Sequence, residues 1–305
     1  MGAGYFTSRD WSDYKARRGF SASSTVSDYY TRRSIKDDFD PKNIKVRESC
    51  DSADHPESTP IILGLDVTGS MGSVLTTISK KLNVLIQEIL DREPVKDPQI
   101  MVMAFGDTEC DRYPLQVTQF ESDIRIAEQL NDIYFERGGG GNDGESYSLP
   151  WYFAARKTKT DAYLKRNKKG YLFTMGDEKY LDVLGKDRIK YFIGDDVQAN
   201  LTAEELYNEV SKQYVCYHLL IEEGNGMRMR GNEVIDKWQN LMGQYAIPVA
   251  DCTKIPEIIV SILQVEAGKD KEAVTKSWDK STALVVDKAI KNLEIAKGKE
   301  GLIEF

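Results

Sequence analysis

The sequence predicts an α/β protein with a doubly wound, mostly parallel central sheet and helices on both faces. Two observations predict this fold. Short apolar runs alternate with helical segments along the chain, and most of these runs lack the alternation of a half-exposed sheet. We divide the chain into an N-terminal arm over residues 1–58, the α/β domain over 59–265 and a C-terminal helical extension over 266–305.

Buried parallel strands are predicted where a short, β-branched run stands between helical segments. These strands cover residues 61–65, 100–105, 170–175, 215–221 and 246–249, and an edge or half-exposed strand covers 115–120. Helices with an apolar period of 3.6 are predicted at residues 73–91, 122–134, 146–158, 202–213 and 254–264. Strands and helices in this alternating order favour a Rossmann-like arrangement with right-handed crossovers.

The two flanking segments differ from the domain. The arm is rich in Ser, Asp, Arg and Lys but carries scattered aromatic residues such as Trp11 and Tyr14. A disordered tail has few aromatics, so we expect the arm to lie on its own domain or on a neighbour. In the extension, one stripe of a helix holds Trp278, Val285, Ala289, Leu293 and Ala296. That helix either packs back on the domain or binds a partner.

Composition excludes several classes of function. The chain has 49 acidic and 41 basic residues, a net charge of -8, which disfavours a general nucleic-acid binder. Its 4 cysteines form no CxxC pair and it has only 2 histidines, so a zinc site of Cys and His is not expected. No apolar run matches a signal peptide or the ~20 residues of a membrane helix. We therefore expect a cytoplasmic protein with no membrane partner.

The first predicted strand ends in a polar motif, DVTGSMG, that begins at Asp66. An acid and two hydroxyls, Asp66, Thr68 and Ser70, alternate just past the carboxyl end of a buried strand, where open α/β sheets bind ligands. The intervening Gly69 allows a tight turn that brings the three oxygens together. Oxygen ligands without His or Cys select hard cations, so this motif predicts a site for Mg²⁺, Mn²⁺ or Ca²⁺.

These residues resemble the DxSxS motif of von Willebrand factor A domains with a metal-ion-dependent adhesion site. The motif has the DxTGSMG form found in intracellular members, and the resemblance covers about residues 60–265. It implies that Asp66, Thr68 and Ser70 ligate the metal. It also implies a protein-binding module and not an enzyme.

The family's second and third metal loops are matched less closely. The second normally supplies a Thr after paired glycines, but here the run GGGGNDGES begins at Gly138 and lacks it. Asn142 or Asp143 is the expected replacement ligand. The third loop has an Asp right after its strand. Here the matching Asp177 comes two residues later than in the family.

The implied mechanism is adhesion through the metal. Two neutral hydroxyls leave a Mg²⁺ ion under-neutralised, so it attracts a further carboxylate from outside the chain. The expected partner is a protein that offers an Asp or Glu to the open position on the metal. The arm and the extension could also dock neighbouring copies within a larger assembly.

Two rival functions remain open on the sequence alone. The motif at Asp66 also resembles the DKTGT nucleophile motif of haloacid dehalogenase-type phosphatases, which use Mg²⁺. The later pairs Asp177-Glu178 and Asp195-Asp196 look like the acidic loops of those enzymes, but their Lys is Val67 here. A third possibility is a structural subunit of a virus particle or other large complex with a vestigial metal site. The run IKVRES at residues 44–49 loosely resembles proteins of tailed phages.

Overall fold

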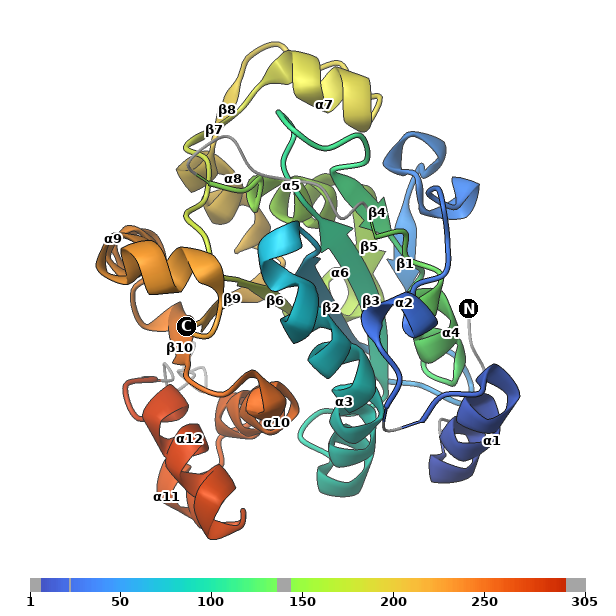
Figure 1. Cartoon of the computed structure of the whole chain (residues 1–305), viewed down its shortest axis with the longest axis vertical. Coiled ribbons are helices and arrows are strands. Elements are labelled where there is room, and N and C mark those ends of the chain that lie inside the picture. Colours follow the sequence, from blue (N-terminus) through green and yellow to red (C-terminus); the bar gives the residue numbers. More distant parts are fainter. Residues whose placement is uncertain (1–6, 22, 136–143, 295–305) are drawn as a thin grey trace, which may run out of the picture.

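The fold is an α/β sandwich around one six-stranded sheet (Figure 1). The computed structural model describes residues 7–21, 23–135 and 144–294. The strand order is β10-β9-β6-β2-β3-β4, and all neighbouring pairs are parallel except β3 with β4. In this order the strands are β10 (Ala246–Val249), β9 (Tyr214–Ile221), β6 (Gly170–Gly176), β2 (Thr59–Asp66), β3 (Pro98–Phe105) and β4 (Leu115–Val117). The predicted fold class is confirmed.

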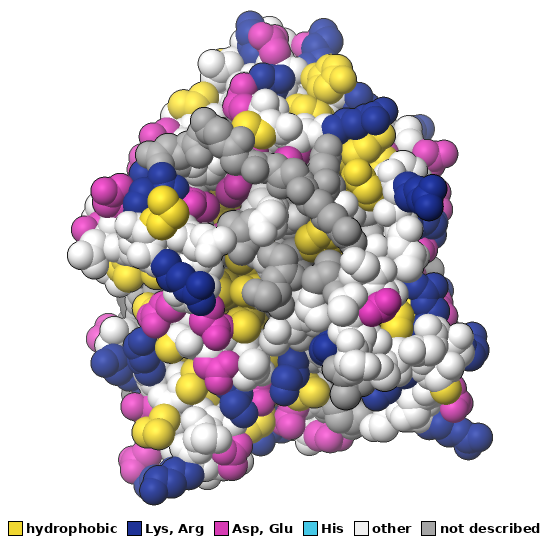
Figure 2. Space-filling model, viewed as in Figure 1, with side chains coloured by type: hydrophobic (Ala, Val, Ile, Leu, Met, Phe, Trp, Pro, Cys, Tyr) yellow, Lys and Arg dark blue, Asp and Glu magenta, His cyan; other side chains and the backbone are white. Residues whose placement is uncertain are grey.

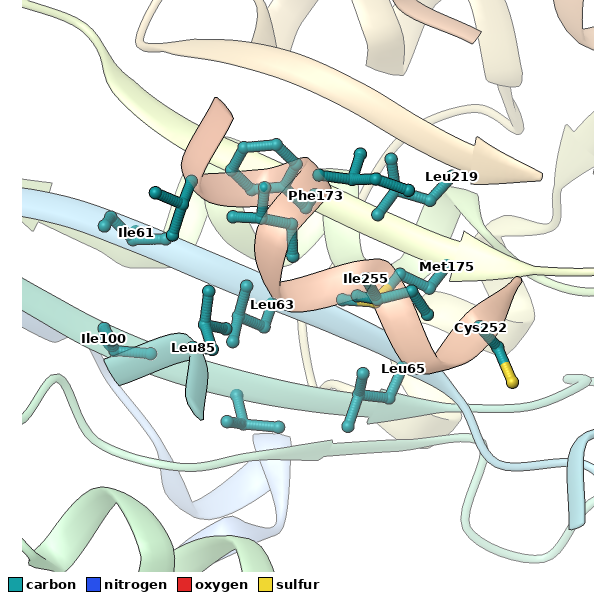
Figure 3. Packing of buried hydrophobic residues seen from close by; sticks show 14 of the residues in the cluster. Ile61, Leu63, Leu65, Leu85, Ile100, Phe173, Met175, Leu219, Cys252 and Ile255 are labelled. Carbon is teal, nitrogen blue, oxygen red and sulfur yellow. The ribbon is translucent and has the colours of Figure 1, made fainter. Parts of the chain in front are cut away.

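Both faces of the sheet are covered because successive side chains of each strand point to opposite sides. Ile61, Leu63 and Leu65 of β2 belong to one apolar cluster, while Ile62 belongs to the other. Figure 3 shows the first cluster, in which Leu63 and Leu65 of β2 lie near Ile255 across the layer. Helices α3 (Gly72–Arg92), α4 (Arg125–Asn131) and α10 (Ile255–Glu266) cover that face, and α5 (Ser148–Lys157), α8 (Ala203–Val210) and α9 (Asn225–Met242) cover the other.

Several elements differ from the expectation. Strand β4 is an edge strand, as predicted, but the half-exposed alternative is wrong because all three of its residues are buried. Helix α9 was not anticipated, since Gly226, Gly231 and a mostly polar surface hide its period. The region after β6, residues 178–200, has no predicted helix or strand. It contains β7 (Val183–Leu184) and α7 (Lys186–Phe192), with β8 (Leu201–Thr202) directly after it, and a small second sheet pairs β1 (Arg47–Ser49) with β5 (Thr158–Thr160) ahead of α6 (Asp161–Arg166).

The described part of the arm lies on its own domain. Helix α1 (Ser8–Arg18) buries Trp11 and Tyr14 in the first apolar cluster, and a short helix α2 (Val26–Tyr29) follows. Asn131 of α4 donates a hydrogen bond of 3.1 Å to the Tyr14 hydroxyl. Arg32 pairs with Asp132 at 3.2 Å. The domain therefore supplies the packing partners of Trp11 and Tyr14, which the sequence alone could not identify.

The C-terminal extension also packs back on the domain. It forms two helices, α11 (Lys271–Lys276) and α12 (Lys280–Ile290), beside α10. The expected single helical stripe is therefore wrong, because the chain turns before Asp279, whose side chain caps α12. The Trp278 indole donates to the Ser261 hydroxyl at 2.9 Å. Ala296, the last residue of that stripe, lies outside the described residues.

The parallel sheet has two chemically different ends. The carboxyl edge is where β2 and β6 end, at Asp66 and Gly176, and the amino edge is where they begin, at Thr59 and Gly170. No helix among the described residues is long and apolar enough to cross a membrane.

Candidate functional site

The loop after β2 folds around the carboxylate of Asp66. This side chain is 0% exposed, and its Oδ1 accepts hydrogen bonds from the Thr68 backbone N–H at 2.9 Å and from the Thr68 hydroxyl at 2.6 Å. An Asp that binds the backbone two residues later makes a tight turn. A 3₁₀ turn over Gly69–Met71 follows, and α3 begins at Gly72. The turn therefore holds an acid and a hydroxyl together at the carboxyl edge.

Asp177 reaches the same edge from β6. The strand continues through Gly176, so Asp177 is the first residue beyond it, and this explains why it comes later in the chain than the family pattern implies. Its side chain is 0% exposed, and its Oδ2 accepts a 3.0 Å hydrogen bond from the N–H of Gly226 in the first turn of α9. A helix start is a favourable place for a carboxylate.

Tyr147 connects these two loops. Its hydroxyl donates to Asp66 Oδ2 at 3.3 Å and accepts from the Glu178 backbone N–H at 3.4 Å. The hydroxyl lies so close to Gly176 that a Cβ there would be 1.9 Å from it. Only glycine at position 176 leaves room for the phenol, so strand β6 and Tyr147 are matched in shape.

An aromatic platform, formed by His218 and Trp238, packs against the ring of Tyr147. The Tyr147 ring contacts His218 and Trp238 edge to face, with centroids 5.0 and 4.9 Å away, while His218 and Trp238 stack at 3.5 Å. The Trp238 indole donates to the Glu178 carbonyl at 2.9 Å. Burial lowers the pKa of His218 well below its usual value, so this ring is neutral. The platform fixes the site without adding positive charge.

The electrostatics of the site favour a bound cation. Burial raises the pKa of Asp66 to about 7, and the nearby Asp177 carboxylate adds to the shift. Burial likewise raises the pKa of Glu145 to about 10, with Asp66 and Asp107 as the next causes. Several acids are thus held together out of water, and each would be stabilised in its ionised form by a positive charge.

The sequence did not single out Glu145, Tyr147 or Asp107 as site residues. Glu145 is 7% exposed and Asp107 is 1% exposed, and each has one carboxylate oxygen, Oε2 and Oδ2, without a hydrogen-bond partner. Glu145 stands in the quoted second loop. The position of Glu145, just before a predicted apolar helix, was the one feature of the sequence that could have marked it as a site residue. The role of Tyr147 depends on Gly176, which no sequence pattern links to it.

The remaining predicted ligands cannot be placed in the same way. Asn142 and Asp143 lie outside the described residues. Ser70 lies in the 3₁₀ turn that begins directly after Thr68, but its side chain is also outside the described part. Of the six predicted ligands, the structure brings together Asp66, Thr68 and Asp177.

The donor set fits a hard divalent cation. It offers two carboxylates and a hydroxyl, all oxygen ligands, and Asp66 makes no ion pair with a Lys or Arg of the described residues. Within the described ranges, no group of three or more His, Cys, Asp or Glu side chains could hold a metal on its own. Hydroxyls and a further ligand would therefore have to complete the shell.

The acidic pair that the phosphatase hypothesis uses later in the chain is engaged elsewhere. Asp195 accepts a 2.9 Å hydrogen bond from the Tyr152 hydroxyl and pairs with Lys157 at 2.8 Å. Asp196 pairs with Lys190 at 3.4 Å. These contacts give Asp195 a structural role, whereas the exposed pair of Asp196 is weak.

Comparisons with known proteins give fold-level likenesses only. No protein-family model matches the chain, and no curated protein matches it. The pilus adhesin SpaC of Lactobacillus rhamnosus GG, in its open conformation, is 7% identical with a TM-score of 0.47, covering 75% of this chain and 31% of that one. Proximal thread matrix protein 1 of the mussel byssus is 11% identical with a TM-score of 0.44, covering 72% and 49%.

A third similar structure is the conserved hypothetical protein BatB of Bacteroides thetaiotaomicron. It is 14% identical with a TM-score of 0.34, covering 53% of this chain and 66% of that one. The chain thus spans about a third of SpaC and half of the mussel protein. With TM-scores of 0.34 to 0.47 and identities of 7 to 14%, these likenesses are too distant to assign a fold family, a ligand or a partner.

Proposed function

We propose that this chain is a divalent-metal-dependent protein-binding module of the von Willebrand A type, and not an enzyme. One observation carries the proposal. The fully buried Asp66 carboxylate is fixed by Thr68 and Tyr147 and lies near the charge of Asp177. Within the described residues, no Lys or Arg forms an ion pair with Asp66. Such an arrangement costs stability unless a cation offsets it, which is the usual mark of a functional site.

In this proposal some residues bind the metal ion and another orients a ligand. Asp66, Thr68 and Asp177 would hold the ion, with Ser70 and either Asn142 or Asp143 as further ligands. Tyr147 orients Asp66 through its hydroxyl. When bound, Mg²⁺ or Mn²⁺ supplies an open coordination position that takes a carboxylate of the partner protein.

Helix α9 gives the partner a second contact beside the metal. Met229 is 80% exposed, and it lies one turn beyond Gly226, whose N–H binds Asp177. The preceding Arg228 is also exposed. We expect the partner to place its Asp or Glu next to an apolar residue that packs on Met229. Within the described residues, the aromatic side chains of the arm and the extension pack on this chain, so we place the partner contact at the carboxyl edge.

Peptide selection tests this function without knowing the partner. A random peptide library is panned on the full-length protein either in Mg²⁺ at about 10 mM or in EDTA. This Mg²⁺ concentration exceeds a dissociation constant of about 1 mM, which is the weak end for divalent-cation sites. Peptides recovered only with metal should share an Asp or Glu and should not bind Asp66→Asn. Met229→Ser should weaken peptide binding but leave metal binding unchanged. Enrichment that is independent of metal, or that survives in Asp66→Asn, would refute the metal bridge.

The same samples separate binding from catalysis. Asp195→Asn removes an acid that pairs with Lys157 and serves as the control for losing a carboxylate. A generic phosphate ester is added to the wild type, Asp66→Asn and Asp195→Asn in Mg²⁺. The proposal expects no phosphate release from any of them. Metal-dependent release that only Asp66→Asn abolishes would establish the phosphatase instead.

A further inference from the structure

A basic groove lies at the amino edge of the sheet, opposite the metal edge. It has a volume of about 720 Å³. We define it by its lining residues, which are Glu57, Ser58, Thr59, Val95, Lys96, Ala162, Arg166, Lys168, Lys169, Tyr171 and Val215. Four of these side chains are cationic and one is acidic. A positive hollow of this size is unexpected in a chain whose net charge is -8.

The topology explains how the cations gather. Lys96 precedes β3, and Arg166, Lys168 and Lys169 precede β6, so parallel strands bring these segments to one edge. Three strand residues, Thr59 of β2, Tyr171 of β6 and Val215 of β9, belong to the lining of the groove. A ligand in the groove would therefore rest on the rigid sheet and not on a loop.

One cation of the groove is fixed and the others are available. Arg166 is 19% exposed, pairs with Asp51 and donates a 2.7 Å hydrogen bond to the Ser58 carbonyl. Lys96 makes only a solvent-exposed pair with Glu57 at 3.3 Å, and such pairs are weak. Lys168 and Lys169 are exposed and no salt bridge to either is found within the described residues, although the Glu266 carboxylate lies close enough to Lys169 to interact with its charge. A multiply charged anion would neutralise them together.

One wall of the groove is apolar. It is formed by Val95, Tyr171 and Val215, all partly exposed. Burial raises the pKa of Tyr171 to about 12, so its phenol stays neutral and can donate a hydrogen bond. An aromatic face beside an array of cations suits a ligand with a flat ring on one side and negative charge on the other.

We propose that this groove binds a small polyphosphate, of the nucleoside diphosphate class, with its phosphoryl groups on the Arg166, Lys168 and Lys169 side and its ring on Tyr171. Phosphoryl oxygens accept charge-assisted hydrogen bonds from guanidinium and ammonium groups. The volume falls in the ~300–1,000 Å³ range of small-molecule sites. This site goes beyond the proposed metal-dependent function and does not depend on it.

Calorimetric titration of the full chain with pyrophosphate and with ADP, in EDTA, tests the proposal. Both should bind at one saturable site, and ADP should bind more tightly because its ring contacts the apolar wall. The variant Lys168→Glu/Lys169→Glu should weaken both by at least about tenfold, since two attractive charges become repulsive. Lys45→Glu/Lys186→Glu makes the same charge change at exposed positions outside the groove, and it should bind like the wild type.

Three outcomes would overturn the proposal. These are no saturable binding to the wild type, equal loss in the control variant, or a short single-stranded oligonucleotide binding more tightly than ADP through the same lysines. The last would assign the groove to a nucleic-acid backbone. Asp66→Asn should bind ADP like the wild type, so failure at this edge is distinguishable from failure of the metal site.

Discussion

The two ends of the sheet have opposite electrostatic character. At the carboxyl edge, Asp66, Asp177 and Glu145 are buried, and no described Lys or Arg pairs with Asp66. At the amino edge, Lys168 and Lys169 are exposed in an open groove in which cations outnumber acids, with Glu57 in the lining and Glu266 near Lys169. Figure 2 shows acidic and basic side chains interspersed over the face that it presents.

This difference shows how one scaffold can hold two kinds of unbalanced charge. Acids that are buried and close together are costly, so they must be held by specific hydrogen bonds and are poised for a strongly bound cation. Exposed lysines cost little and need no such support. We therefore expect substitutions at the carboxyl edge to change stability and binding together. Substitutions of exposed residues at the amino edge should change binding alone.

The largest effect is expected from Gly176→Ala. The new Cβ would lie 1.9 Å from the Tyr147 hydroxyl, so the phenol or the strand must move. Overpacking of this kind costs about 3 kcal/mol or more of unfolding free energy, which urea denaturation measures. Gly231→Ala is the matched control, because nothing lies within 4 Å of the Cβ that it adds. If both variants were equally stable, the close fit between Tyr147 and β6 would be wrong.

The next effect is a pH dependence at the carboxyl edge. The pKa of Asp66 is raised from 3.8 to about 7 in the folded, metal-free state, so the folded protein binds the proton more tightly than the unfolded chain. Its contribution to stability is present below pH 3.8 and is lost as the pH rises to about 7. Thermal unfolding in EDTA should show this loss, and Asp66→Asn should reduce the slope. An unchanged slope in Asp66→Asn would show that Asp66 does not titrate in this window.

A smaller effect is expected at the amino edge from Arg166→Gln. Arg166 pairs with Asp51 and binds the Ser58 carbonyl, and both ionic side chains are mostly buried. Loss of hydrogen bonds to a charged group costs about 2 kcal/mol. Urea denaturation should show this cost, while metal binding at the opposite edge should stay unchanged. A loss of metal affinity would indicate that the two edges are coupled through the sheet.

The smallest effect on stability is expected from Tyr147→Phe. The ring remains on its platform and only the hydroxyl that contacts Asp66 and Glu178 is removed, at a cost of about 1 kcal/mol. Mn²⁺ affinity should nevertheless fall about tenfold, because groups that orient a metal ligand commonly contribute that much. Tyr152→Phe removes a buried hydroxyl bonded to Asp195 and is the control. Equal Mn²⁺ affinity in both variants would exclude an orienting role for Tyr147.

The fold was more predictable from the sequence than the site. Apolar runs such as residues 61–65 indicated the buried strands, and the motif at Asp66 indicated the edge where ligands bind. Helix α9 escaped notice because two glycines interrupt its apolar period. Its first turn nevertheless holds Asp177. The basic groove was equally hidden, since its cations come from separate segments that only the parallel pairing brings together.

The spacing along the chain fitted the family pattern poorly at Asp177, which was nevertheless predicted as a ligand. Asp177 looked displaced from the family pattern, yet it directly follows β6 because the strand extends to Gly176. The contributions of Tyr147 and Glu145 depend on burial and on neighbours distant in sequence, such as Asp66. A linear pattern contains neither kind of information. Residues that orient or tune a predicted metal ligand are therefore harder to find in the sequence than that metal ligand itself.

The most direct test of the central claim is a titration of the metal-free protein with Mn²⁺, followed by electron paramagnetic resonance, beside Asp66→Asn and Asp195→Asn. We predict one saturable site in the wild type and in Asp195→Asn. We predict no site in Asp66→Asn, although circular dichroism should show that this variant is folded. Absence of binding in the wild type, or equal binding in Asp66→Asn, would contradict the assignment of the carboxyl edge as a metal centre.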